Sequence, residues 1–159
     1  MISRRSFLVL LAAPALRGDI TVIAESARIG DTHVKVGLVA GDGGAVIIPM
    51  LVGIAKAKDM MMRGRILNGV EAERIGLVTH VRPTEQVLDE AKAIARELAA
   101  LPRNAVGWTK LSVNKPLREQ LNLVLDTSIA YEMLTVNSND HATAVKAFVE
   151  KRKPEFKGD

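Results

Sequence analysis

A histidine and an aspartate flank a short apolar segment that ends in a glycine-rich turn. His33 lies at one end, and Asp42 lies between Gly41 and Gly43 at the other. Imidazole exchanges a proton near neutral pH without any shift of its pKa, so His33 is a candidate for acid–base catalysis or substrate contact. The other interpretation of His33 is a structural histidine. Asp42 is a candidate pocket carboxylate, or it caps the following helix, whose N-terminus stabilises negative charge.

The glycines of this turn decide how closely other groups can approach. Gly41, Gly43 and Gly44 permit a tight turn, and Gly41 and Gly43 could let the backbone approach a ligand closely. A strand before the turn and a helix after it would aim backbone N–H groups at one point. Asp31 is interpreted as an ordinary turn residue. The histidines at positions 33, 80 and 141 lack metal-ligand spacing, so we expect no metal site.

The elements around this turn follow from the hydrophobic pattern. β-Branched residues predict a strand over 19–24 and an extended segment over 29–36. Pro49 limits the helix over 45–52 to a short or kinked one, and another helix covers 54–63. A short strand is expected over 77–81. The second half is predicted to be helical, with a helix after Pro83 and Thr84, one from Pro102 that Pro116 stops, one around 121–133 and one over 141–151.

The composition indicates an ordinary globular domain. The chain has 159 residues, of which 48% are hydrophobic and 25% are charged. Because it contains no cysteine, disulfides and thiol nucleophiles are excluded. The net charge of +4 reflects a solvated surface or favours an anionic partner. Aromatic residues make up 3%, too few for a base-stacking platform, so we expect no nucleic-acid partner.

Residues 1–18 differ from the rest of the chain. Arg4 and Arg5 form a twin-arginine pattern, and an apolar run with small residues at 13–15 follows. We consider three interpretations: an export signal, an aberrant N-terminus on a cytoplasmic domain, or an apolar helix that packs on the domain. The run is too short to span a bilayer, so no membrane span is expected. The expected location is cytoplasmic, with export as the alternative.

Four segments in order resemble the enoyl-CoA hydratase/isomerase (crotonase) family. They cover residues 19–27, 36–44, 72–78 and 147–152. The resemblance spans residues 19–159 and implies an α/β ClpP/crotonase spiral of strand–strand–helix units, N-terminally truncated. A partial core would cover 19–100 and a helical trimerisation region 101–159. The family also implies acyl-CoA substrates, hydration of trans-2-enoyl-CoA, no cofactor besides this CoA thioester, and a homotrimer or hexamer.

The sequence departs from this family at the reaction centre. In hydratases, two glutamates activate water and two backbone N–H groups hold the thioester oxygen. The glutamate positions match about Ala13 and His33 here, and residues 10–15 lack the expected glycines. One N–H donor normally comes from a segment further upstream. An active chain would therefore need His33 or Asp42 for proton transfer; the alternative is an impaired remnant that keeps oligomerisation and CoA-tail binding.

Two C-terminal residues match the family's contacts with the CoA tail. Phe148 and Lys151 would share one face of the last helix, at i and i+3. The resemblance implies a ring that stacks on adenine and an ammonium group that pairs with phosphate. Otherwise, Phe148 packs in the core and Lys151 is solvated. The methionines at 60–62 line an acyl pocket or fill the core, and an unpaired apolar edge at 19–24 favours an oligomer.

Overall fold

The computed structural model describes Leu16 and residues 18–159. The order begins with β1 (Val22–Ala24), β2 (Arg28–Ile29), the 3₁₀ helix η3 (His33–Val36), α2 (Gly44–Val52) and α3 (Ile54–Met62). It continues with β3 (Leu67–Asn68), α4 (Gly69–Arg74), β4 (His80–Arg82) and the 3₁₀ helix η4 (Thr84–Gln86). Three helices complete the chain: α5 (Val87–Ala100), α6 (Arg103–Val136) and α7 (Asn139–Val149).

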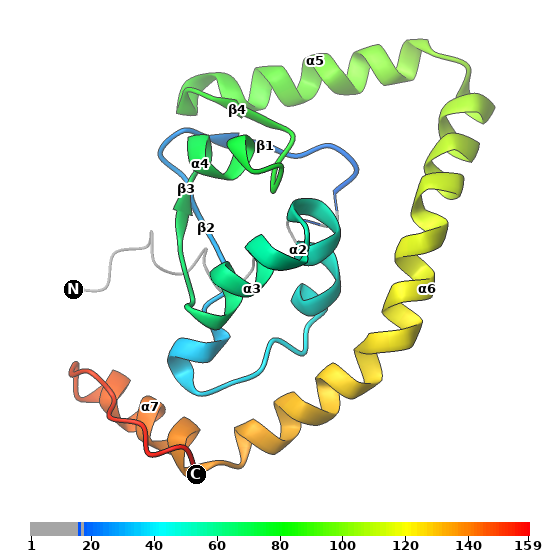
Figure 1. The fold of residues 1–159 in the computed structure, drawn as a ribbon. Coiled ribbons are helices and arrows are strands. Elements are labelled where there is room, and N and C mark those ends of the chain that lie inside the picture. The colour runs from blue at the N-terminus through cyan, green and yellow to red at the C-terminus, as the bar shows by residue number, and fades with distance from the viewer. Residues whose placement is uncertain (1–15, 17) are drawn as a thin grey trace.

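The strands of the described residues form two small pairs, which lie on the side of the molecule opposite α6 (Figure 1). β1 pairs in parallel with β4, with Val22 opposite His80, whereas β2 pairs antiparallel with β3. Figure 1 shows α5 above the first pair and α6 running down one side towards α7. The extended segment expected over 29–36 ends at Ile29, because residues 33–36 turn into η3. The strand expected over 77–81 is also displaced, since β4 begins at His80.

The hydrophobic core lies between α2, α3, α4 and the strand pairs. Ile48 of α2 and Leu77 are 1% and 2% exposed, and Met60 of α3 is 3% exposed. Met60 therefore fills the core, whereas Met62 is 73% exposed. The predicted short helix over 45–52 is confirmed as α2, which contains Pro49 and ends at Val52, with Gly53 as its C-cap. Gly53 has a φ of 81°, which a residue with a side chain rarely adopts.

The segment after β3 begins α4 with a capping box. The Asn68 side chain accepts the backbone N–H of Glu71, and the Glu71 carboxylate accepts the backbone N–H of Asn68. This exchange satisfies two N–H groups that a helix start leaves unpaired. The interactions fix the point at which the chain leaves β3 and packs Ala72, which is fully buried, into the core.

One long helix replaces two of the predicted helices. α6 runs through Pro116, so the prediction that this proline stops a helix is wrong. A proline inside a helix removes one hydrogen bond and crowds the carbonyl four residues earlier, here that of Ser112. Both residues are exposed, which leaves the freed carbonyl accessible to water. Ser128 is the one buried residue of α6, so this helix lies at the surface over most of its length.

Candidate active site

His33 is paired with Asp31 through two hydrogen bonds. Asp31 Oδ1 lies 2.9 Å from His33 Nδ1 and accepts the backbone N–H of His33 at 3.1 Å. Because a carboxylate only accepts hydrogen bonds, Nδ1 carries the proton in neutral His33, and Nε2 is the basic nitrogen. Both residues are buried, at 6% and 8% exposure. Asp31 is therefore a turn residue, as predicted, because it accepts the backbone N–H two residues along, and its carboxylate also contacts the His33 ring.

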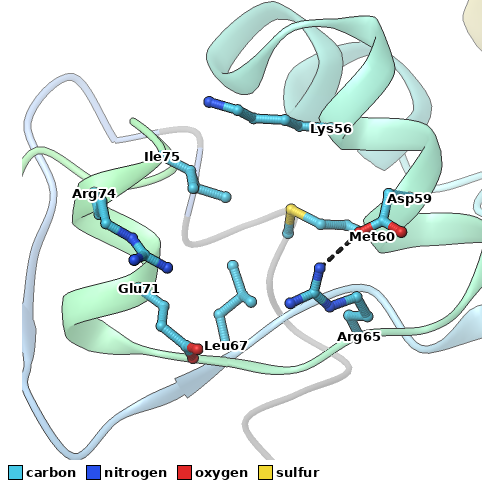
Figure 2. A pocket seen from close by; sticks show the side chains of 8 residues that line it. All are labelled: Lys56, Asp59, Met60, Arg65, Leu67, Glu71, Arg74 and Ile75. Atoms are coloured by element: carbon cyan, nitrogen blue, oxygen red, sulfur yellow. Dashed lines mark hydrogen bonds and ion pairs between the residues drawn. The ribbon is translucent and has the colours of Figure 1, made fainter.

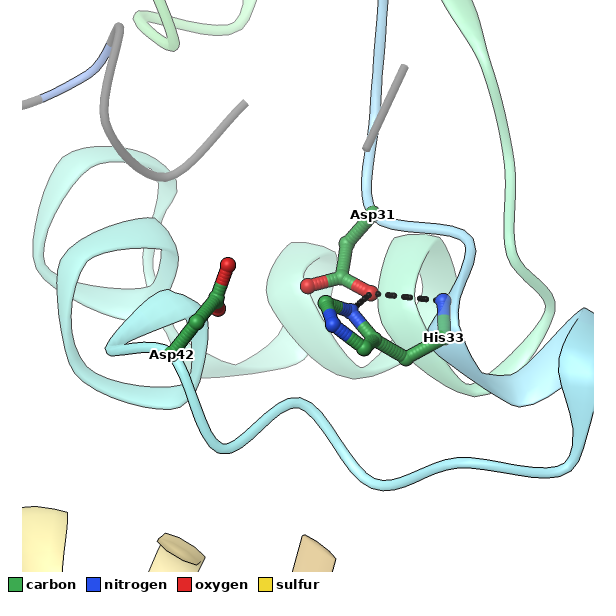
Figure 3. A group of neighbouring side chains, drawn as sticks. All are labelled: Asp31, His33 and Asp42. Atoms are coloured by element: carbon green, nitrogen blue, oxygen red, sulfur yellow. Dashed lines mark hydrogen bonds and ion pairs between the residues drawn. The ribbon is translucent and has the colours of Figure 1, made fainter. Parts of the chain in front are cut away.

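Asp42 faces this pair from the turn before α2, as Figure 3 shows. Its Oδ1 accepts the backbone N–H of Gly44 at 3.3 Å, so it does interact with the helix start. Gly43 has a φ of 98°, in the range that favours glycine. A Cβ at Gly44 would lie 2.8 Å from Asp31 Oδ2. The glycine-rich turn therefore admits two carboxylates beside one imidazole.

A third carboxylate, Glu132, reaches the site from α6. Its Oε1 lies 3.9 Å from His33 Nε2, on the side of the ring opposite Asp31. Ninety-nine positions separate the two residues in the sequence, and no local spacing pattern relates them. Sequence reasoning missed Glu132 for this reason. A helix expected around 121–133 gave no indication of which face would meet the turn.

These carboxylates control the protonation of His33. The hydrogen bond that His33 Nδ1–H donates to Asp31 is the largest cause that raises the pKa of His33 above its ordinary value of 6.5. Burial opposes it, while the negative charges of Asp31, Asp42 and Glu132 add to it. The site therefore stabilises an imidazolium, which is the form that a general base reaches after it accepts a proton.

The same cluster bears on metal binding. One nitrogen or oxygen from each of Asp31, His33 and Asp42 lies within 4.8 Å of the others. The residue types are those that bind divalent ions. However, His33 Nδ1 and Asp31 Oδ1 already bind each other. That no metal ion binds here stays a prediction.

The C-terminal helix packs directly against η3. His141 Nδ1 lies 2.7 Å from the carbonyl oxygen of Val36. Gly37, with a φ of 69°, makes this approach possible, because a Cβ there would lie 2.9 Å from the His141 backbone nitrogen. α7 is therefore fixed next to the segment that carries His33.

The structure corrects the placement of one CoA-tail candidate. Phe148 is on α7 and is 66% exposed, so its interpretation as a core residue is wrong. Lys151 lies beyond the end of α7 and has a φ of 55°, so the two residues do not share a helix face. The N–H groups of Lys151 and Arg152 bind the carbonyls of Phe148 and Ala147, a Schellman arrangement. Their contact with CoA stays a prediction.

A pocket lies away from the His33 cluster. Its volume is about 220 Å³, and it lies between α3 and α4 (Figure 2). Arg65 there binds Asp59 at 2.6 Å, and Lys56 and Arg74 lie on its rim. None of the candidate catalytic residues lines it.

The segment with the twin-arginine pattern and the position about Ala13 lies outside the described residues. The predictions for residues 10–15 and for an export signal therefore stay predictions. Among Leu16 and residues 18–159, no helix combines the length and apolar character needed to cross a bilayer.

Comparison with known proteins identifies the family. The family model described as enoyl-CoA hydratase/isomerase matches residues 12–159. A probable enoyl-CoA hydratase of Mycobacterium bovis is 32% identical over 146 residues, which cover 89% of this chain and 55% of that protein. The mitochondrial methylglutaconyl-CoA hydratase of Rattus norvegicus is 35% identical over 149 residues, which cover 91% of this chain and 47% of that one.

A solved structure supports the same assignment. The crystal structure of an enoyl-CoA hydratase/isomerase from Pseudoalteromonas atlantica matches 93% of this chain and 60% of its own, with 30% identity and a TM-score of 0.86. This likeness confirms the crotonase fold. The chain spans about half the length of the curated relatives it matches. By sequence and by fold, the chain belongs to the enoyl-CoA hydratase/isomerase family.

Proposed function

We propose that the protein acts on acyl-CoA thioesters and adds water to a trans-2-enoyl-CoA, with His33 as the general base. One observation carries this proposal: a buried Asp31–His33 pair occupies the place where a hydratase glutamate falls in the family resemblance. The carboxylate fixes the Nδ1–H tautomer and leaves Nε2 to accept a proton.

The groups of the site can supply both proton transfers that the addition of water requires. His33 Nε2 takes a proton from water, and the oxygen forms a bond to the β-carbon of the enoyl group. The electrons of the double bond move to the α-carbon, which then accepts a proton. That proton is the one that His33 took from the water. The imidazolium passes it on through Asp42, whose carboxylate lies within 4.8 Å, so both groups return to their starting protonation states.

We further propose that Phe148 and Lys151 contact the adenine and phosphate groups of CoA. The exposed ring of Phe148 supports this role, since stacking on a base needs an accessible face. An oligomer, expected to be a trimer, is proposed from the exposed apolar side chains along α6, which include Trp108, Leu123 and Leu134. A cytoplasmic location is proposed because CoA thioesters are cytoplasmic metabolites.

Turnover of a short trans-2-enoyl-CoA tests the proposal, followed through loss of the conjugated thioester absorbance. We expect an enzyme-dependent rate that disappears in His33→Gln while circular dichroism shows an unchanged fold. His80→Gln is the matched control, because His80 lies on β4 and outside the cluster. A folded wild-type protein with no turnover would support the impaired remnant instead.

A further inference from the structure

Glu132 is held over the glycine-rich turn by its own helix. One turn further along α6, Thr135 Oγ1 accepts the backbone N–H of Val39 at 3.1 Å. The same hydroxyl group donates to the Glu132 carbonyl at 2.8 Å. These bonds attach α6 to the chain just before Gly41 and fix the register of Glu132 against the turn.

Gly41 provides the space that the Glu132 side chain occupies. A Cβ at Gly41 would overlap Glu132 Oε2 and would lie 2.7 Å from the Glu132 Cβ. Gly41 does not have a positive φ, so the backbone itself does not require glycine there. The absent side chain therefore serves the approach of Glu132, whose carboxylate points at the far nitrogen of His33.

We infer that Glu132 is a positioning residue for His33, which orients the ring through Nε2 and stabilises the protonated imidazole. Asp31 holds one side of the ring at 2.9 Å, and Glu132 faces the other side at 3.9 Å. That separation exceeds a hydrogen bond and is short enough for a charge interaction, or for one bridging water. This inference deepens the proposed function, and the catalytic role of Glu132 rests on that function.

Three carboxylates from three separate segments face this imidazole. They are Asp31 before η3, Asp42 before α2 and Glu132 on α6. Glu132 is the one whose position depends on the docking of a distant helix. Glu132 couples α6 to the protonation of His33, so a variant that displaces α6 or the Glu132 carboxylate should change the pKa of His33.

A titration of His33 by NMR tests this inference without any substrate. We would label the histidine rings of the full chain and assign His33 from the spectrum of His33→Gln. Glu132→Gln removes the charge, and Gly41→Ala displaces the carboxylate while keeping it. Both variants should lower the pKa of His33. Glu132→Asp, which keeps the charge, should retain most of the wild-type pKa.

Two controls match these changes. Glu119→Gln removes an exposed carboxylate from the same helix, and Gly107→Ala adds a Cβ where nothing lies within 4 Å. Both should leave the titration of His33 unchanged. An unchanged pKa in folded Glu132→Gln, or an equal fall in Glu119→Gln, would overturn the inference. Because this readout needs no turnover, it separates failure of the inference from failure of the proposed function.

Discussion

Replacement of Asp31 by asparagine isolates the charge that supports His33. The amide is nearly isosteric with the carboxylate, so its oxygen can still accept from His33 Nδ1 and from the backbone N–H. The substitution removes the negative charge of the group that accepts two hydrogen bonds, of 2.9 and 3.1 Å. The Asp31 side chain is only 5% exposed, so water does not replace that charge. A hydrogen bond to a charged group contributes about 1.5–3 kcal/mol and one between neutral groups about 0.5–1.5 kcal/mol, so the change costs about 1–1.5 kcal/mol for the bond to the ring. Since each 1.36 kcal/mol is a tenfold change in rate, we expect kcat/KM to fall about 5- to 13-fold.

The pH dependence of Asp31→Asn gives a second readout. In the wild type, Asp31 raises the pKa of His33 above 6.5, so the base becomes available only at higher pH. The variant should shift the acid limb of the pH–rate profile to lower pH. The free energy of unfolding should depend on pH as it does for any histidine whose pKa is raised in the folded state. The contribution is fully present below pH 6.5 and is lost as pH rises through the pKa of folded His33, so the two proteins should differ most in mild acid.

The assay combines kcat/KM over a range of pH with chemical denaturation at matched pH values. Asp59→Asn is the control, because Asp59 is a half-exposed carboxylate on α3 that binds Arg63 and Arg65 and does not belong to the cluster. An acid limb that does not move in Asp31→Asn would refute the assigned role of Asp31. So would a loss of rate equal to that of the control.

Other predictions concern the core and the CoA tail. Leu77→Ala should reduce the free energy of unfolding by about 2–5 kcal/mol, because Leu77 is 2% exposed, whereas the 62% exposed Leu88→Ala should change it by less than about 0.5 kcal/mol. Equal effects in urea denaturation would contradict the assigned core. Phe148→Ala should raise KM for an enoyl-CoA at least about 5-fold, from about 1 kcal/mol of stacking, and leave a pantetheine thioester unaffected. Equal changes for both substrates would place Phe148 away from adenine.

Local sequence patterns predicted much of the fold. Apolar periodicity and glycine stops located α2, α3 and the last helix to within a few residues. Pro116 misled the prediction, because the cost of a proline inside a helix is decided by what surrounds it. The flanking turns of α6 continue the helix on both sides, and the exposed surface lets water satisfy the freed carbonyl.

The site was predicted only in part, for a geometric reason. His33 and Asp42 were found because they lie close to the same turn in the sequence. Asp31 lies in a turn, as its sequence indicates, but nothing in its neighbourhood shows that its carboxylate is buried against the His33 ring. The contact of Glu132 with His33 depends on how α6 docks, although the two residues lie almost one hundred positions apart in the sequence. No periodicity of the sequence predicts that contact. The sequence predicts Lys151 on the last helix, but α7 ends at Val149, and Lys151 itself adopts a left-handed conformation.

The central claim is that His33 is the base that activates water. The most direct test compares the acid limb of the pH dependence of kcat/KM for a short trans-2-enoyl-CoA with the NMR titration of His33 in the same protein. The account predicts that the two pKa values coincide and lie above 6.5. An acid limb in the carboxyl range, or one that differs from the titration of His33, would contradict it.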